Sequence, residues 1–179
     1  MGSFSELVMS FPLRADVGPD VLASFASIAV PDPDAPPLPP PNREDPVADD
    51  WDLDDPERDR SGPWSHDWGA LLGASSTTAY IGSDQGATMR WRRRRWVVTS
   101  RATWKSAPED FLPSLAVLGT VIDVSAGRGY EPYHQADGVM TGFFVGYARH
   151  EREPRPWLLW ADGQRLVAEN LNPPGFFLL

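Results

Sequence analysis

The first thirty residues pair a short apolar run with an amphipathic stretch, which predicts a strand followed by a helix. The run at 7–13 is apolar and ends beside Pro12, as is typical of a buried strand. Residues 18–20, Gly-Pro-Asp, then supply a proline for a first helical turn and an acid for its N-terminal dipole. One helix face would carry Val21, Leu22, Phe25 and Ile28. Pro31 should end this helix.

The clearest strand pattern lies between residues 88 and 104. Two runs, 88–91 and 96–104, flank the four arginines at 92–95. In the second run one face would carry Trp96, Val98, Ala102 and Trp104, and the other Val97, Thr99, Arg101 and Thr103. We expect a hairpin with an arginine-rich tip. One long strand is the alternative, because four arginines are poor turn chemistry.

The rest of the chain predicts a second helix and several strands. Ser106-x-x-Glu109 reads as a capping box, and Pro113 should bend or shorten the helix before Gly119 ends it. Its inward face would carry Phe111, Leu112, Leu115 and Leu118. Strands are expected over 120–124 and 138–147, and a hairpin over 156–168 that turns at 161–163. Residues 126–130 would be a glycine-rich loop, and Tyr133 and His134 would also lie in a loop. The apolar tail, 172–179, should pack on the domain or on a partner.

This order is β–α–(insertion)–β–β–α–β with further strands, which is the split βαβ, ferredoxin-like order. We therefore expect residues 1–179 to form a single α+β domain. It would contain an antiparallel sheet with two helices on one face, an insertion after the first helix, and extra C-terminal antiparallel strands.

Charge singles out the insertion, residues 31–62. The net charge of the chain is −9, and eleven of its 25 acidic residues lie within 31–60 against three arginines, so the remainder is close to neutral. The prolines at 31–41 favour an extended, solvated spacer. An SH3-type ligand anchored by Arg43 is excluded, because position 38 of the required register holds leucine.

The amino-acid composition excludes several types of catalytic and metal site. The chain has no cysteine, which excludes disulfides, thiol catalysis and cysteine-ligated zinc. The three histidines, His66, His134 and His150, have no metal-ligand spacing, and no nucleotide or nucleophile motif is present. Ser65-His66-Asp67 are adjacent in sequence, the wrong geometry for a triad. We expect no enzyme activity and no cofactor. The absence of an apolar span or a signal peptide predicts a cytoplasmic protein.

Basic and aromatic residues alternate around the predicted hairpin. The candidate interaction surface consists of Arg90, Trp91, Arg92, Arg93, Arg94, Arg95, Trp96, Arg101 and Trp104. Cations for phosphate and rings for stacking suit single-stranded nucleic acid. The glycine of the RNP1 pattern is absent from residues 95–99, however. Edge-strand protection and docking of the chain's own acidic segment are the competing interpretations.

A second candidate site is a small-molecule pocket. An apolar cluster that includes Trp64 and Trp68 could roof it, with Tyr130, Tyr133 and His134 close by in a loop.

Four segments carry a resemblance to known proteins. These are residues 142–149 (GFFVGYAR) with 156–159 (PWLL), and residues 96–101 (WVVTSR) with the capped helix after them. Together they resemble a group of small bacterial α+β domains of unknown function. The resemblance extends over about half of the chain and implies the fold but no activity. The acidic insertion departs from it.

We therefore expect a domain that acts by protein–protein association, with a partner protein or with a second copy as a homodimer. One specific version is an acidic inhibitor or immunity-type protein, whose acids at 44–59 would steer a basic partner. The alternatives are single-stranded nucleic-acid binding through the arginine and tryptophan residues, and small-molecule binding.

Overall fold

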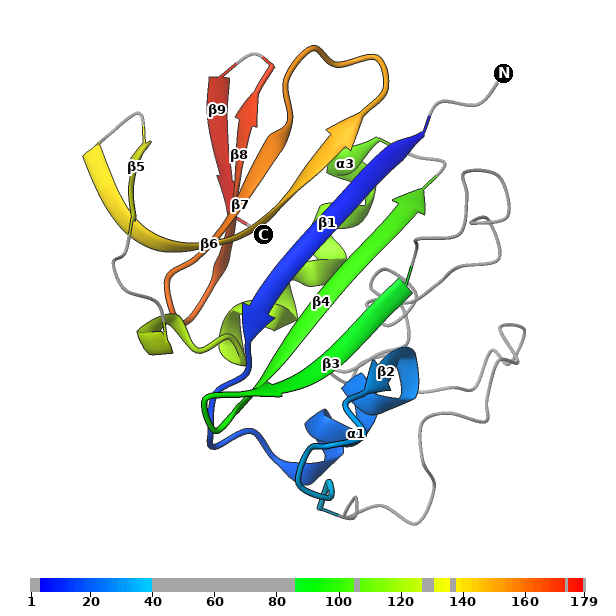
Figure 1. The fold of residues 1–179 in the computed structure, drawn as a ribbon. Helices are drawn as coiled ribbons and strands as arrows, with labels where there is room; N and C mark the ends of the chain where they lie inside the picture. The colour runs from blue at the N-terminus through cyan, green and yellow to red at the C-terminus, as the bar shows by residue number, and fades with distance from the viewer. Residues whose placement is uncertain are drawn as a thin grey trace, which may run out of the picture.

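The protein is built around one nine-stranded sheet. The computed structural model describes residues 4–39, 86–104, 107–126, 131–135, 138–172 and 174–178. The strands are β1 (Ser5–Pro12), β2 (Ala29–Pro31), β3 (Gly86–Arg92), β4 (Arg95–Trp104), β5 (Glu131–Gln135), β6 (Gly138–His150), β7 (Trp157–Ala161), β8 (Leu166–Leu171) and β9 (Pro174–Leu178). Their order is β2-β3-β4-β1-β6-β7-β8-β9, and β5 pairs with β6 (Figure 1).

The predicted α+β class is confirmed, but the sheet is larger than expected. It is also mixed, because β2 runs parallel to β3 while every other neighbouring pair is antiparallel. The ferredoxin-like assignment remains a prediction. Within the described residues, no helix has the length and apolarity needed to cross a bilayer.

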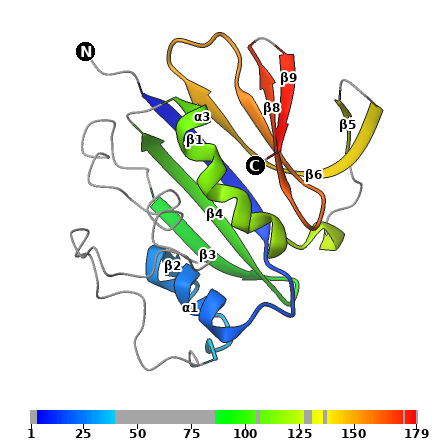
Figure 2. The same cartoon turned by 180° about the vertical axis from the view of Figure 1, so that it is seen from behind.

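Two helical segments lie on the same face of the sheet (Figure 2). Helix α1 (Pro19–Ile28) begins at the predicted proline. It ends at Ile28 because the chain then extends into β2, so that Pro31 belongs to an edge strand. An edge strand tolerates proline, whose missing N–H removes no essential ladder bond.

The second helical segment differs from its prediction at both ends. The short helix α3 (Pro108–Phe111) has Ala107 as its N-cap residue, and the Ala107 N–H donates to the Asp110 carboxylate at 3.2 Å, in the place predicted for Glu109. Ser106 of the predicted capping box lies outside the described residues. The 3-10 helix η3 (Leu112–Thr120) follows, which agrees with the expected effect of Pro113.

The strand predicted over 120–124 was also wrong. Helix η3 reaches Thr120, only Ile122 makes an isolated bridge, to Leu13, and a 3-10 turn, η4 (Val124–Ala126), comes next. β-Branched composition favours extended backbone but does not impose it where the neighbouring helix continues.

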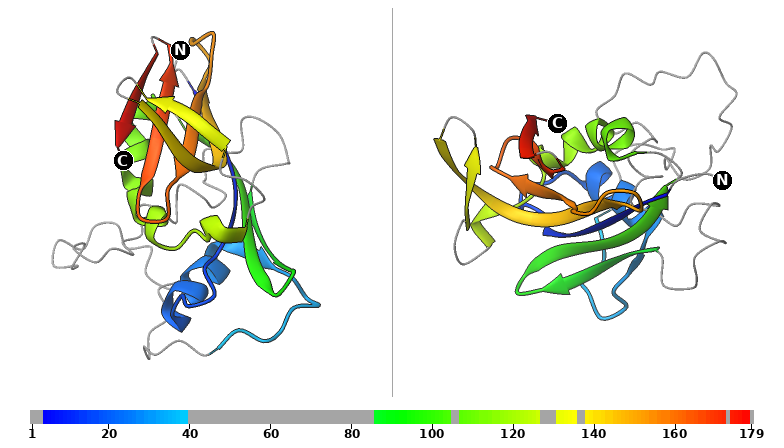
Figure 3. Two further views of the ribbon diagram at one scale, coloured as in Figure 1. Left: turned by 90° about the vertical axis from the view of Figure 1, so that its left-hand side faces the viewer. Right: turned by 90° about the horizontal axis from the view of Figure 1, so that it is seen from above.

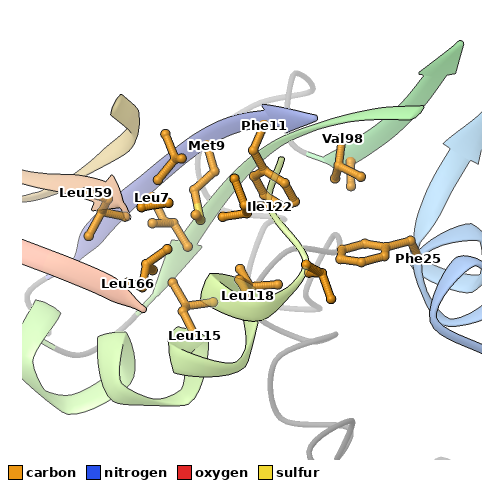
Figure 4. Close-up of a cluster of buried hydrophobic side chains, with 14 of the residues drawn as sticks. Leu7, Met9, Phe11, Phe25, Val98, Leu115, Leu118, Ile122, Leu159 and Leu166 are labelled. Atoms are coloured by element: carbon orange, nitrogen blue, oxygen red, sulfur yellow. The ribbon is translucent and has the colours of Figure 1, made fainter. Parts of the chain in front are cut away.

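The core lies between the sheet and these helices (Figure 4). Alternate residues of β1 point inward and are fully buried: Leu7, Met9 and Phe11. The predicted inward face of the second helical segment is confirmed, with Phe111, Leu112, Leu115 and Leu118 all buried. From α1, Phe25 meets Phe11 edge-on with ring centroids 6.1 Å apart. These contacts bind α1 and η3 to one face of the sheet.

Strand β6 bends across the sheet, and a glycine permits the bend (Figure 3). The register with β7 shifts between Phe144 and Gly146. A Cβ atom at Gly146 would lie 2.1 Å from the carbonyl oxygen of Val8, so β6 approaches β1 more closely than any side chain would allow.

Two C-terminal segments form strands. Residues 131–135, whose Tyr133 and His134 are expected in a loop, pair with β6 as β5. The apolar tail joins the same sheet, because β9 pairs with β8 from Pro174 to Leu178. The expectation that the tail packs on the domain is thus confirmed at the level of the backbone. The hairpin at 156–168 is also confirmed, as β7 and β8.

Candidate binding site

The predicted hairpin is confirmed, and its turn is unusual. β3 and β4 are joined by two residues, Arg93 and Arg94, so the single long strand was wrong and the tip is shorter than four residues. Both turn residues have positive φ, 49° and 64°. Asn-Gly is the usual occupant of such a two-residue turn. A non-glycine residue there costs about 1–2 kcal/mol.

The pleat of the hairpin separates the tryptophans from the arginines. Trp91 and Trp96 are register partners on the helix-covered face, with ring centroids 5.2 Å apart, and Trp96 is buried. Nothing is described of the side chain of Trp104. The opposite, open face carries Arg90, Arg92, Arg95 and Arg101. The structure therefore divides the predicted arginine and tryptophan surface between two sides of the sheet.

The open face carries exposed arginines. None of the described helices or strands covers it (Figure 1). Arg90, Arg101 and Arg149 are exposed on it, and Arg101 is paired with Glu6 at 2.7 Å. Thr88 and Thr99 share a hydroxyl hydrogen bond of 2.6 Å at its centre. Cations held at fixed spacing on a rigid sheet suit an acidic partner better than an apolar one.

The first acid of the insertion is anchored on the hairpin. Asp32, whose side chain is only 6% exposed, accepts the N–H of Trp91 at 3.2 Å and lies 3.5 Å from a guanidinium nitrogen of Arg92. Burial raises the pKa of this carboxyl. The N–H groups of Trp91 and Asp34, together with Arg92 and Arg90, outweigh that effect, so the pKa of Asp32 lies below its usual value.

A second acid holds the other side of the hairpin. Asp123, which follows the bridge at Ile122, forms an ion pair with Arg95, and the two charged groups lie 2.9 Å apart. The same carboxylate accepts the N–H and the hydroxyl of Ser125 at 2.9 and 2.6 Å. Arg95 is thereby fixed in orientation and only 34% exposed.

The hairpin keeps an excess of positive charge. We call the five residues Arg90, Arg92, Arg93, Arg94 and Arg95 the arginine hairpin. Within the described part of the chain, carboxylates pair with only two of them, Arg92 and Arg95. The excess lies at an exposed tip, where it can act on a charged partner.

A pocket of about 460 Å³ lies beside the tip of the arginine hairpin. Its lining combines cations, hydroxyls and apolar groups: Ser10, Phe11, Pro12, Arg92, Arg93, Arg95, Val97, Ser125 and Phe143. Ser10, Ser125 and Phe143 were not predicted as site residues. They come from β1, η4 and β6, and no local sequence signal marks them.

The small-molecule pocket predicted from the sequence stays a prediction, because most of its residues are not described. Trp64, Trp68 and Tyr130 lie outside the described residues, while Tyr133 and His134 belong to β5, opposite Met140 and Val139 of β6. His66 also lies outside the residues that the structure describes. His150 is buried at the end of β6, where its Nδ1 accepts the N–H of Arg152. The described residues contain no cluster of metal-ligating side chains.

Comparison with known proteins assigns no relationship. No family model, curated protein or solved structure matches the chain. The resemblance to small bacterial α+β domains therefore stays a prediction, and the chain is assigned to no family.

Proposed function

We propose that this protein is a binding module whose arginine hairpin and open face hold an acidic segment of another protein. The observation that carries the proposal is the tip of the hairpin. Arg93 and Arg94 occupy positive-φ positions that disfavour them, and they have no ion pair with a described carboxylate. Strain retained at an exposed, charged turn favours a role in binding over one in stability.

The division of the hairpin by the pleat favours protein over nucleic acid. Single strands bind by stacking bases on rings beside the cations. Trp91 and Trp96 lie on the helix-covered face instead, away from the arginines of the open face. Phosphate contacts would remain without that stacking, which makes nucleic-acid binding the alternative outcome of the test below.

The same charge argues against a second copy of the chain as the partner. A two-fold interface through the open face would place arginine hairpins of like sign together. Among the described residues, the exposed large apolar side chains are Val30 and Phe144, which lie on β2 and β6. Neither supplies the apolar patch that a permanent dimer needs.

We also propose that β1, α1, β3, β4, α3–η3 and β6 form a ferredoxin-like unit. The neighbours β3-β4-β1-β6, all antiparallel, support this assignment. Strand β2 and strands β7 to β9 would then be additions at its two edges. An experimental structure in which β1 does not lie between β4 and β6 would contradict it.

Fluorescence anisotropy with two labelled probes tests the binding proposal. The probes are a poly-glutamate peptide and an oligothymidylate of about equal charge. We expect the full chain to bind the peptide at low salt, and the affinity to fall at least about tenfold when NaCl rises from about 50 to about 500 mM. Preference for the oligothymidylate would favour the nucleic-acid alternative.

A charge-neutralised variant tests whether the chain's own acidic residues compete with the peptide. The nine acidic residues of 44–59 can be replaced by their amides in the full-length chain, which preserves its length. If these acids compete for the arginine hairpin, the amide variant binds poly-glutamate more tightly than the natural chain. Failure of both chains to bind the peptide at low salt would contradict the proposal.

A further inference from the structure

We infer that the pocket beside the tip of the arginine hairpin binds a small phosphate monoester that carries an apolar or aromatic body. This ligand class is distinct from the acidic protein partner proposed above, although the two share part of the hairpin. The pocket's volume of about 460 Å³ falls within the usual range for small-molecule sites, about 300–1,000 Å³.

The cationic side of the pocket suits a doubly charged group. Arg92, Arg93 and Arg95 line it. Two carboxylates each form one ion pair with this lining: Asp123 with Arg95 at 2.9 Å, and Asp32 with Arg92 at 3.5 Å. A guanidinium has five N–H donors in a planar fork, so an orienting ion pair leaves donors for a second anion. A phosphate monoester carries close to two negative charges at neutral pH. A carboxylate carries one.

The hydroxyl groups have different roles. The proton of the Ser125 hydroxyl goes to Asp123, so Ser125 fixes the carboxylate that orients Arg95. The exposed side chain of Ser10, on the β1 side of the pocket, is the hydroxyl placed to donate to a ligand oxygen.

The remaining lining is apolar and comes from three strands. Pro12 of β1, Val97 of β4 and Phe143 of β6 border the pocket. They would contact the ester's organic body, whose transfer from water favours binding. Inorganic phosphate lacks this body and should bind more weakly than an aryl phosphate.

Isothermal titration calorimetry of the full-length chain tests the inference with three probes: phenyl phosphate, inorganic phosphate and benzoate. At about pH 7.5, where the monoester is dianionic, we expect phenyl phosphate to bind at least about fivefold more tightly than either of the others. Affinity should fall at about pH 5, where the phosphate loses a charge. Equal affinity for benzoate, or no binding of phenyl phosphate, would overturn the inference.

Three variants locate the site. Arg93→Asn removes a cation with a residue that the turn accepts, and Ser10→Ala removes a donor on the open face. Each should weaken phenyl phosphate binding severalfold. Arg90→Gln, outside the pocket, should leave it within about twofold. If all three variants lose the same affinity for phenyl phosphate, or if no variant loses any, the ligand does not bind in this pocket.

The two proposals can fail separately. Ser10→Ala should leave poly-glutamate binding unchanged, because the hydroxyl contributes no charge to the open face. If poly-glutamate binds and phenyl phosphate does not, the pocket inference falls and the proposed function stands. The converse result would keep the pocket and remove the acidic protein partner.

Discussion

At residue 146 the backbone of β6 passes against β1 with no room for a side chain. The Cβ of an alanine would lie 2.1 Å from the carbonyl oxygen of Val8 and 2.8 Å from the Cα of Met9. Both obstacles are backbone atoms of a central strand, which cannot rotate aside. Relief would require β1 and β6 to separate where their ladder is formed.

Gly146→Ala should therefore destabilise the protein by about 3 kcal/mol or more. Gly18→Ala is the matched control, since nothing lies within 4 Å of its Cβ position and its φ of −66° suits alanine. We expect that control to cost about 1 kcal/mol or less. Urea unfolding measures both, and equal losses would contradict the close approach.

Asp32 gives the fold a local dependence on pH. Its carboxyl is buried against β3, and its pKa is lowered by the N–H groups of Trp91 and Asp34 and by nearby guanidinium groups. A carboxyl whose pKa is lower in the folded than in the unfolded protein contributes stability above the unfolded pKa. That contribution is lost as the pH falls through the folded value.

Asp32→Asn should thus destabilise the protein at about pH 7, and the difference from the natural chain should shrink as the pH falls below about 4. Unfolding free energies of both proteins, measured in urea across this range, provide the test. A difference that stays constant down to about pH 3 would show that the Asp32 charge does not stabilise the fold.

At the level of elements, the β3–β4 hairpin combines a regular antiparallel ladder with a turn whose two residues disfavour its backbone conformation. Seven register pairs connect β3 to β4, from Gly86 and Arg101 down to Arg92 and Arg95. The two tip residues alone adopt the left-handed backbone that favours asparagine and glycine. Asparagine and glycine at these two positions would make the folded protein more stable.

Replacement of Arg93 by Asn and of Arg94 by Gly should stabilise the protein by about 1–2 kcal/mol, because the new residues accept positive φ. The same double variant should bind poly-glutamate more weakly, since two cations are lost. Thermal unfolding and anisotropy measure the two effects.

Arg93→Gln with Arg94→Gln is the matched control. It removes the same two charges but keeps side chains that disfavour the turn, so binding should fall with no gain in stability. A gain in stability equal to that of the Asn-Gly variant would contradict strain as the cause.

Local patterns predicted the elements whose signals are themselves local. The β3–β4 hairpin follows from strict alternation between 96 and 104, and α1 from Pro19 and its apolar face. The pattern failed over 120–124 and 131–135. Five-residue apolar or mixed runs fit several backbones, and neighbours decide between them: η3 extends through the first, and β6 supplies a pairing edge for the second.

At the scale of the whole molecule, the charge of the chain and the charge of its open face have opposite signs. The net charge of −9 is concentrated in residues 31–60, whereas the open face carries arginines. One of the acids, Asp32, is bound against the hairpin. A partner that approaches this face meets a positive surface despite the acidic overall composition.

The candidate site could be predicted from sequence only in part. The arginines of the hairpin are visible as a cluster, and strand alternation already separates Trp96 from Arg101. The pocket depends on Ser10, Ser125 and Phe143, which are more than 15 residues apart in the chain and meet only through the order of the strands. Asp123 is equally nonlocal, since the bridge of Leu13 to Ile122 places it beside Arg95.

The central claim is that acidic partners bind at the arginine hairpin and not through net charge. Anisotropy of labelled poly-glutamate on two charge-matched, full-length variants tests it most directly. One is Arg93→Glu with Arg94→Glu. The other is Arg152→Glu with Arg155→Glu, exposed residues between β6 and β7 at the opposite end of the sheet (Figure 1). We predict at least about a tenfold loss of affinity for the first and less than about threefold for the second. Equal losses would contradict the claim.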